Sequence, residues 1–189
     1  MSLTSAVREA ISEVRSLRIV QEYELLARHG NAGVFVLPSE DDPNVWNCVI
    51  FPHQGIYKGG VFKCALRFGS EYPFSPPLLH FLGPVPFHPL VSAEDGGVEV
   101  VLSFPAKKWD RQRCFVVHLL AWVKSLFYMT LEDVEKALLG GEGGAGFTAN
   151  INALALLRND RRAFVTKARQ CVRRSLSEVE RSPSAFTLS

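Results

Sequence analysis

The chain has 189 residues, of which 47% are hydrophobic and 21% are charged. This composition is typical of a globular protein with a real core, and the length predicts one domain with extensions. The formal net charge of +2 excludes the strong field that recruits nucleic acid, so we expect no nucleic-acid partner. No stretch reaches about 18 uncharged apolar residues, so we expect no membrane insertion.

Four cysteines are spread along the chain without a C-x-x-C pair: Cys48, Cys64, Cys114 and Cys171. This spacing predicts neither a zinc site nor a disulfide framework, and no cofactor is expected. The first residues carry mixed charge and no apolar core, so we expect no secretory signal. Reduced thiols in a cytoplasmic protein are the resulting expectation.

The N-terminal region predicts helix. Residues from Thr4 to His29 include no glycine or proline, and Gly30 suits a helix end. One long helix, or two with a break near Ser16, would fit this pattern. Apolar residues recur near helical spacing, at Val7, Ile11, Val14, Val20, Tyr23, Leu26 and Ala27.

Four short segments rich in strand-forming residues follow, at 33–37, 45–51, 61–68 and 78–82. The links between them are short. Because parallel strands need long crossover connections, we expect an antiparallel meander. The next segment, 83–109, has little periodicity and several glycines and prolines, which predicts mostly irregular structure.

The C-terminal half predicts further helices, so the expected fold class is α+β. Phe115 to Tyr128 is apolar on most sides, as in a buried helix. Thr130–Asp133 opens a short helix with a capping pattern. Gly140–Gly146 cannot hold a helix, and no phosphate-binding motif follows it. Two last helices are expected at Asn150–Leu157 and Asp160–Val179.

Four motifs, in the same order, resemble those of ubiquitin-conjugating enzymes. They are Tyr57-Lys58-Gly59-Gly60-Val61-Phe62, the proline-rich stretch from Tyr72 to Phe81, Trp109, and Asn159-Asp160-Arg161 with Phe164 and Ala168-Arg169. The resemblance covers about residues 15–175. It implies a UBC-like fold, in which a four-stranded antiparallel meander is flanked by an N-terminal helix, a central buried helix and C-terminal helices.

The same resemblance implies a domain organisation. Residues 1–14 would be an N-terminal helical extension, and residues 15–180 would form the UBC-like domain. An insertion would lie at about 130–148, including the Gly140–Gly146 run, and residues 181–189 would be a flexible tail.

The centre of the motif region departs from the family. In ubiquitin-conjugating enzymes a cysteine about ten residues after a His-Pro pair carries ubiquitin as a thioester, and an asparagine follows the pair. Here Leu90 follows His88 and Pro89, and Glu99 stands at the cysteine position. Leucine donates no hydrogen bond, and losing an oxyanion donor typically costs about 100- to 1000-fold in rate. We therefore predict a degenerate site and a pseudoenzyme.

Another cysteine could in principle replace the missing nucleophile. Cys114 is the best candidate, because it lies near the start of the central helix beside Arg111 and Arg113, and both features lower a thiol pKa. In the family template, however, this position is well away from the catalytic groove. The other three thiols are expected on core faces, where free cysteine is inert.

Three further features leave alternatives open. We interpret His88 as a loop residue that hydrogen-bonds to the backbone rather than as a catalytic base. An acidic loop of Glu94, Asp95 and Glu99 could be a solvated turn or a binding epitope. One face of the last helix could be solvated or could contact an acidic partner, since it can carry Arg162, Arg169 and Arg173.

Among variants without the cysteine, the chain resembles the Fused Toes type, in Phe87-His88-Pro89-Leu90-Val91 and Lys107-Lys108-Trp109. That resemblance implies an inactive adaptor that joins Hook-type coiled-coil proteins in vesicle traffic. Two alternatives stay open. One is a conjugating enzyme for ubiquitin or a ubiquitin-like protein that uses a non-standard cysteine. The other is a cofactor subunit that binds ubiquitin without a covalent bond and assists the ubiquitin machinery.

Overall fold

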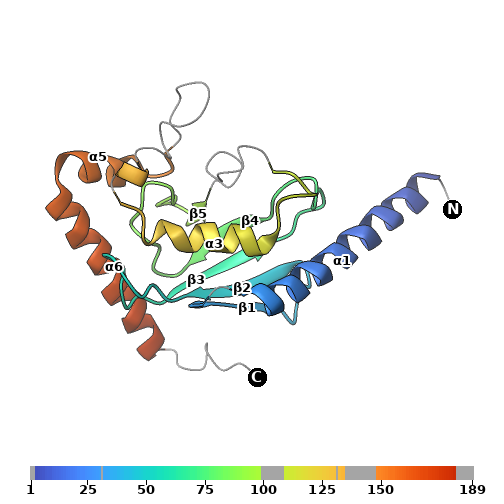
Figure 1. Cartoon of the computed structure of the whole chain (residues 1–189), viewed down its shortest axis with the longest axis horizontal. Helices are drawn as coiled ribbons and strands as arrows, with labels where there is room; N and C mark the ends of the chain where they lie inside the picture. The colour runs from blue at the N-terminus through green and yellow to red at the C-terminus, as the bar shows by residue number, and fades with distance from the viewer. Residues whose placement is uncertain (1–2, 31, 99–108, 131, 135–147, 182–189) are drawn as a thin grey trace.

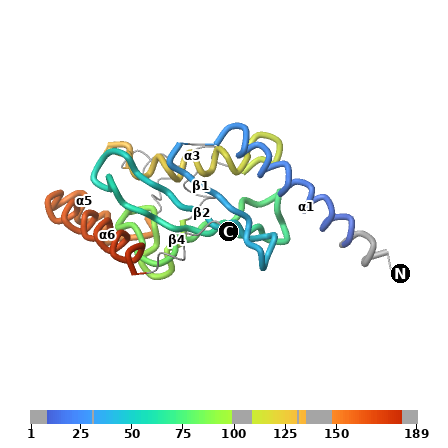
Figure 2. Tube along the Cα trace, turned by 90° about the horizontal axis from the view of Figure 1, so that it is seen from below, coloured from blue at the N-terminus to red at the C-terminus, as the bar shows by residue number. Residues whose placement is uncertain are grey.

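The computed structural model describes residues 3–30, 32–98, 109–130, 132–134 and 148–181, with residues 3–8 described by their backbone alone. The chain starts with one long helix, α1 (Leu3–His29), so the alternative with a break near Ser16 is wrong. Its first turns extend beyond the rest of the molecule (Figures 1 and 2).

An antiparallel sheet follows α1. Its strands are β1 (Val34–Pro38), β2 (Val45–Ile50), β3 (Phe62–Arg67), β4 (Leu78–Leu82) and β5 (Gly97–Val98), in that spatial order. The predicted four-stranded meander and the α+β class are confirmed. The short β5 was not predicted, and it adds a fifth strand inside the segment expected to be irregular.

The core lies against one face of this sheet. Alternating residues of the three central strands are buried, for example Cys48 on β2, Cys64 on β3 and Phe81 on β4. The central helix α3 (Val116–Leu126) lies along that face, as Figure 1 shows, and buries six of its eleven residues. The prediction of a helix buried on most sides is therefore confirmed.

Two helices complete the fold at the end of the molecule opposite the start of α1 (Figures 1 and 2). Helix α5 (Ile151–Asn159) is capped by Asn150, and α6 (Arg161–Arg181) follows directly. Both helices were predicted. The expected apolar side of α6 is confirmed, because Phe164 and Ala168 are buried there.

The predicted capping pattern after α3 is also present. Thr130 Oγ1 accepts the Asp133 N–H at 3.2 Å, and Asp133 Oδ2 accepts the Thr130 N–H at 3.0 Å. Several sequence predictions lie outside the described residues: Glu99, Lys107-Lys108, the Gly140–Gly146 run with most of the expected insertion, and the tail beyond Arg181.

Candidate functional site

The His88–Leu90 turn sits beside the glycine turn that follows β2. The Tyr57 hydroxyl donates to the Phe87 carbonyl at 2.6 Å, which fixes the entry to the turn. His88 is buried, and its Nδ1 accepts the Leu90 N–H at 3.1 Å. Burial lowers the pKa of His88 from 6.5 to about 4, so the ring is neutral at neutral pH. The expected backbone contact of His88 is therefore present, and the ring holds the turn.

The carbonyl of Pro89 ties this turn to the start of α5. It accepts hydrogen bonds from Thr148 Oγ1 at 2.9 Å, from the Ala149 N–H at 2.9 Å and from the Asn150 N–H at 3.1 Å. The Asn150 side chain in turn accepts the Ala153 N–H at 2.9 Å and caps the helix. The turn is therefore fixed on one side by the Tyr57 hydroxyl and on the other by the start of α5.

Leu90 does not face a groove. Its side chain is only 1% exposed and belongs to the hydrophobic core. Leucine has only a hydrocarbon side chain here, whereas an amide side chain would have N–H donors. Because the Leu90 side chain is buried, it is directed into the protein. This turn therefore has no side-chain donor at Leu90 that could stabilise an oxyanion.

The loop after the turn is a compact hydrogen-bonded structure. Ser92 Oγ accepts the N–H groups of Glu94 at 3.3 Å and Asp95 at 3.4 Å, and Asp95 Oδ1 accepts the Gly97 N–H at 2.9 Å. The hydrogen bonds from Ser92 and then Gly97 lower the pKa of Asp95. Glu94 and Asp95 are exposed, which fits both the solvated-turn and the epitope interpretations.

Gly96 sets the path of the chain toward the cysteine position. Its φ is +72°, and an added Cβ would collide with the carbonyl oxygen of Phe81, so only glycine suits this place. Val98 then pairs with Leu79 in β5. Glu99 comes next and lies outside the described residues.

Cys114 lies at the far end of α3 from His88. It is buried just before the helix, where its Sγ accepts the Asp110 N–H at 3.3 Å. At the other end of α3, Phe127 packs on the Tyr57 ring, 5.4 Å away, and Tyr57 also faces His88. Eleven helical residues span about 16 Å. The structure therefore does not bring Cys114 and His88 together.

The remaining thiols are packed as expected. Cys48 and Cys64 are buried opposite each other on β2 and β3. The hydrogen bond with Cys64 and burial raise the pKa of Cys48. Cys171 is half-buried against the core, and burial raises its pKa as well. A raised pKa keeps a thiol protonated and unreactive.

Sequence reasoning missed Glu22, a fully buried carboxylate on α1. Its Oε1 accepts from Arg18 Nε and from the Tyr72 hydroxyl, both at 2.8 Å, and its Oε2 accepts the Val116 N–H at 2.8 Å. The sequence does offer one signal that Glu22 lies on the buried side of the helix. Core residues stand three positions before it and four positions after it. Through the last two hydrogen bonds, the Glu22 carboxylate joins α1 to the proline-rich segment and to α3.

Neither a metal centre nor a membrane span is found in the part of the chain that the structure describes. No three histidine, cysteine, aspartate or glutamate side chains there gather closely enough to hold a metal ion. None of the described helices is both long enough and apolar enough to cross a bilayer.

Comparisons with known proteins agree with the motifs. The family model for ubiquitin-conjugating enzymes matches residues 18–172. A crossbronx homologue of Anopheles gambiae is 29% identical over 178 residues, which is 92% of this chain and 73% of that protein. An AKTIP homologue of Nematostella vectensis is 30% identical over 85% of this chain, which spans 49% of that longer protein.

Two further comparisons concern conjugating enzymes themselves. A ubiquitin-conjugating enzyme E2-18 kDa of Schizosaccharomyces pombe is 32% identical over 84% of this chain and 94% of its own length. A solved structure titled "Novel Ubiquitin-Conjugating Enzyme" matches with a TM-score of 0.59 at 24% identity, over 82% of this chain and 92% of that one. This second match supports the fold alone. The chain therefore belongs to the ubiquitin-conjugating enzyme family, and it is also similar to proteins named as crossbronx and AKTIP homologues.

Proposed function

We propose that this chain is a catalytically inactive ubiquitin-conjugating-enzyme variant that works as a protein-binding adaptor. Leu90 carries the proposal: it follows the His-Pro pair and is buried in the core, so no side-chain amide is available there to stabilise an oxyanion. Glu99 adds to it in the sequence, because a carboxylate cannot take up ubiquitin as a thioester. The described thiols are buried or half-buried, and Cys114 is distant from the His88 turn.

The adaptor role rests on what the chain retains. It has lost two groups needed for chemistry, yet it has kept the scaffold over nearly the whole length of a conjugating enzyme. One relative is named for its interaction with another protein, AKT. The Fused Toes resemblance supports a cytoplasmic role in vesicle traffic, with Hook-type coiled-coil proteins as partners.

The surface offered to such partners is the projecting part of α1. Ile11, Val14 and Leu17 are each more than half exposed and are spaced three residues apart, which places them along one side of the helix. We call these three residues the α1 apolar surface. Coiled-coil proteins bind helices through apolar rows of this kind, so this surface has the chemistry that a helical partner needs.

Affinity capture from cell extract tests the adaptor role. The full chain is compared with Leu17→Glu, which places a charge on the α1 apolar surface, and with Ile151→Glu, a change at a similarly exposed position on α5. We expect coiled-coil trafficking proteins with the wild type and Ile151→Glu, and their loss with Leu17→Glu. Recovery of ubiquitin and active conjugating enzymes instead would contradict the adaptor role and favour the cofactor subunit.

A further inference from the structure

The outer edge of β1 is open in the part of the chain that the structure describes. The sheet order begins with β1, which pairs only with β2. Gly33 accepts the Phe51 N–H and Ser39 donates to Val45, both at 2.8 Å. Because paired residues alternate along an antiparallel ladder, Val34, Val36 and Pro38 direct their main-chain groups away from β2.

Proline has no N–H, so its place at this edge leaves no donor unpaired at Pro38. Two N–H groups, those of Val34 and Val36, and their carbonyls therefore remain for a further strand. An edge with free hydrogen-bonding groups is a template for strand addition. Its side chains are apolar on both faces of the sheet, since Phe35 and Leu37 are 58% and 41% exposed on the outer face.

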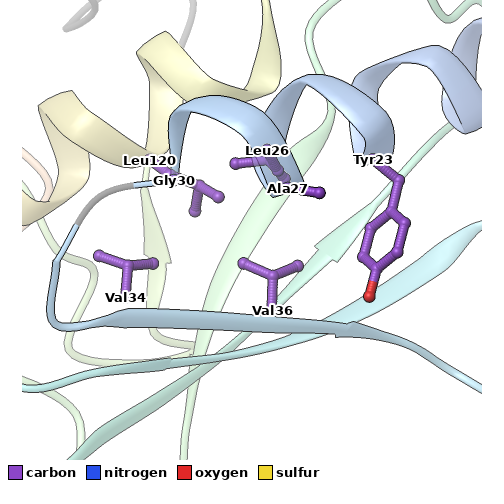
Figure 3. Close-up of a pocket in the computed structure, with 7 residues that line it drawn as sticks. All are labelled: Tyr23, Leu26, Ala27, Gly30, Val34, Val36 and Leu120. Carbon is purple, nitrogen blue, oxygen red and sulfur yellow. The ribbon is translucent and has the colours of Figure 1, made fainter.

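An apolar cavity opens beside this edge. It has a volume of about 120 Å³ and lies between the last turns of α1 and the β1 strand, as Figure 3 shows. Most of the residues that line it have apolar side chains: Tyr23, Leu26, Ala27, Gly30, Val34, Val36 and Leu120. A strand added to β1 would place its own core-side residue next to Val36, at this cavity.

The same edge carries opposite charges at its two ends. Arg28 and His29 form the last turn of α1, shortly before β1 begins, whereas Glu40 and Asp41 follow its end. All four side chains are exposed, and none makes an ion pair with another described residue. In an antiparallel pair the start of one strand lies beside the end of the other. When two β1 edges pair in this way, the basic end of each copy would therefore lie beside the acidic end of the other.

From this self-complementarity we propose that the β1 edge binds the β1 edge of a second copy of this chain, antiparallel and about a two-fold axis. The sheet would then continue across both copies. Among the registers that use both free donors, we propose the one that pairs Val34 of each copy with Val36 of the other, which gives four main-chain hydrogen bonds. In that register the two Phe35 side chains lie on the two-fold axis, next to each other.

The helix above the edge suits the same neighbour. Val20, Tyr23 and Ala27 are exposed and follow one another at spacings of three and four, so they form one row. Tyr23 and Ala27 line the cavity, so this row faces the β1 side (Figure 3). The two-fold axis places the second α1 antiparallel beside the first, where small Ala27 allows close approach. An extended peptide from another protein would use the edge without this helix contact.

The first test removes one edge donor. Val36→Pro deletes an N–H that points away from β2, and Pro38 already holds such a position two residues later, so the fold should persist. Sedimentation of the full chain over a wide concentration range should show a monomer–dimer equilibrium. Losing two symmetric hydrogen bonds should raise the dimer dissociation constant at least about tenfold. A chain that stays monomeric at all concentrations overturns the proposal.

The second test reverses charges. Reversing the acidic end (Glu40→Lys with Asp41→Lys) or the basic end (Arg28→Glu with His29→Glu) should weaken the dimer, and reversing both ends in one chain should restore it. The restored variant controls for damage to the fold. If the combined variant is weaker than either single reversal, the antiparallel edge contact is wrong.

The third test determines the register in which the two β1 strands pair. Phe35→Cys should form an intermolecular disulfide on mild oxidation, because non-hydrogen-bonded pairs bring the two side chains closest. Ile151→Cys, on an exposed part of α5, is the matched control and should stay unlinked, as should the wild type. Equal cross-linking of the two variants would exclude the proposed interface.

Discussion

Glu22 of α1 accepts the backbone N–H of Val116 at 2.8 Å and so caps the central helix from another element. The residue just before α3, Phe115, makes no capping bond with its side chain. A carboxylate at a helix N-terminus interacts favourably with the helix dipole as well as with the free N–H. The N-terminal helix thereby helps to fix the helix on which the core is built.

Glu22→Ala should destabilise the fold. It removes the cap and the acceptor of both Arg18 Nε and the Tyr72 hydroxyl, and losing one member of a buried pair costs about 3 kcal/mol or more. Urea unfolding followed by circular dichroism measures the change. Glu24→Ala, an exposed change on the same helix, should alter the free energy of unfolding by less than about 0.5 kcal/mol. Equal effects of the two changes would exclude the capping role.

His88 should make stability depend on pH below neutrality. Burial lowers its pKa from 6.5 to about 4, so the folded chain keeps the ring neutral while the unfolded chain binds a proton. The stabilisation is complete above pH 6.5 and declines as the pH falls toward 4, by up to about 3 kcal/mol. The urea midpoint should therefore fall as the pH is lowered from about 7.5 to about 5.

His88→Asn should flatten this dependence, since the asparagine does not titrate. His118→Asn is the matched control, because His118 is exposed on α3. Its urea midpoints should follow the wild-type pH profile. A wild-type profile that His88→Asn leaves unchanged would mean that other groups cause the pH dependence.

Gly96→Ala should destabilise the fold much more than Gly59→Ala. Both glycines have positive φ, at +72° and +81°, so alanine is strained by about 1–2 kcal/mol at either position. At Gly59 an added Cβ meets nothing within 4 Å, whereas at Gly96 it collides with the Phe81 carbonyl. Thermal unfolding should therefore show a clearly lower midpoint for Gly96→Ala. Similar midpoints would indicate that the loop before Glu99 adjusts freely.

Leu90→Asn restores the amide of the family tripeptide, but it should not behave as a surface change. The side chain is buried, so the substitution loses apolar burial and places an amide in the core, at a cost of about 2–4 kcal/mol. Leu78→Asn on β4, where the leucine is exposed, should have a small effect. A stable Leu90→Asn variant would indicate that position 90 can turn toward solvent.

Much of the fold could be predicted from local sequence. The alternation of Phe62, Cys64 and Leu66 matches the buried face of β3, and the break at Gly30 matches the end of α1. The apolar face of α6 followed from its spacing. These elements each bury one periodic face, so their pattern is visible without knowing what they pack against.

The rest depended on contacts between distant segments. On α1, Ile11, Val14 and Val20 are exposed while Glu22 is buried, because Arg18, Tyr72 and Val116 supply its partners. Strand β5 has only two residues, and pairing with β4 defines it rather than its own pattern. Leu90 was predicted to lack a donor, but its place in the core required the three-dimensional structure.

The proposed function requires that this scaffold does not carry ubiquitin as a thioester. To test this, the purified chain is incubated with ubiquitin-activating enzyme, ATP and ubiquitin. The products are then resolved on a non-reducing gel beside those of an active conjugating enzyme. We predict no reductant-sensitive adduct for the wild type or for Cys114→Ser. A wild-type adduct that reductant removes, and that Cys114→Ser abolishes, would contradict the inactive-variant proposal and establish the enzyme alternative.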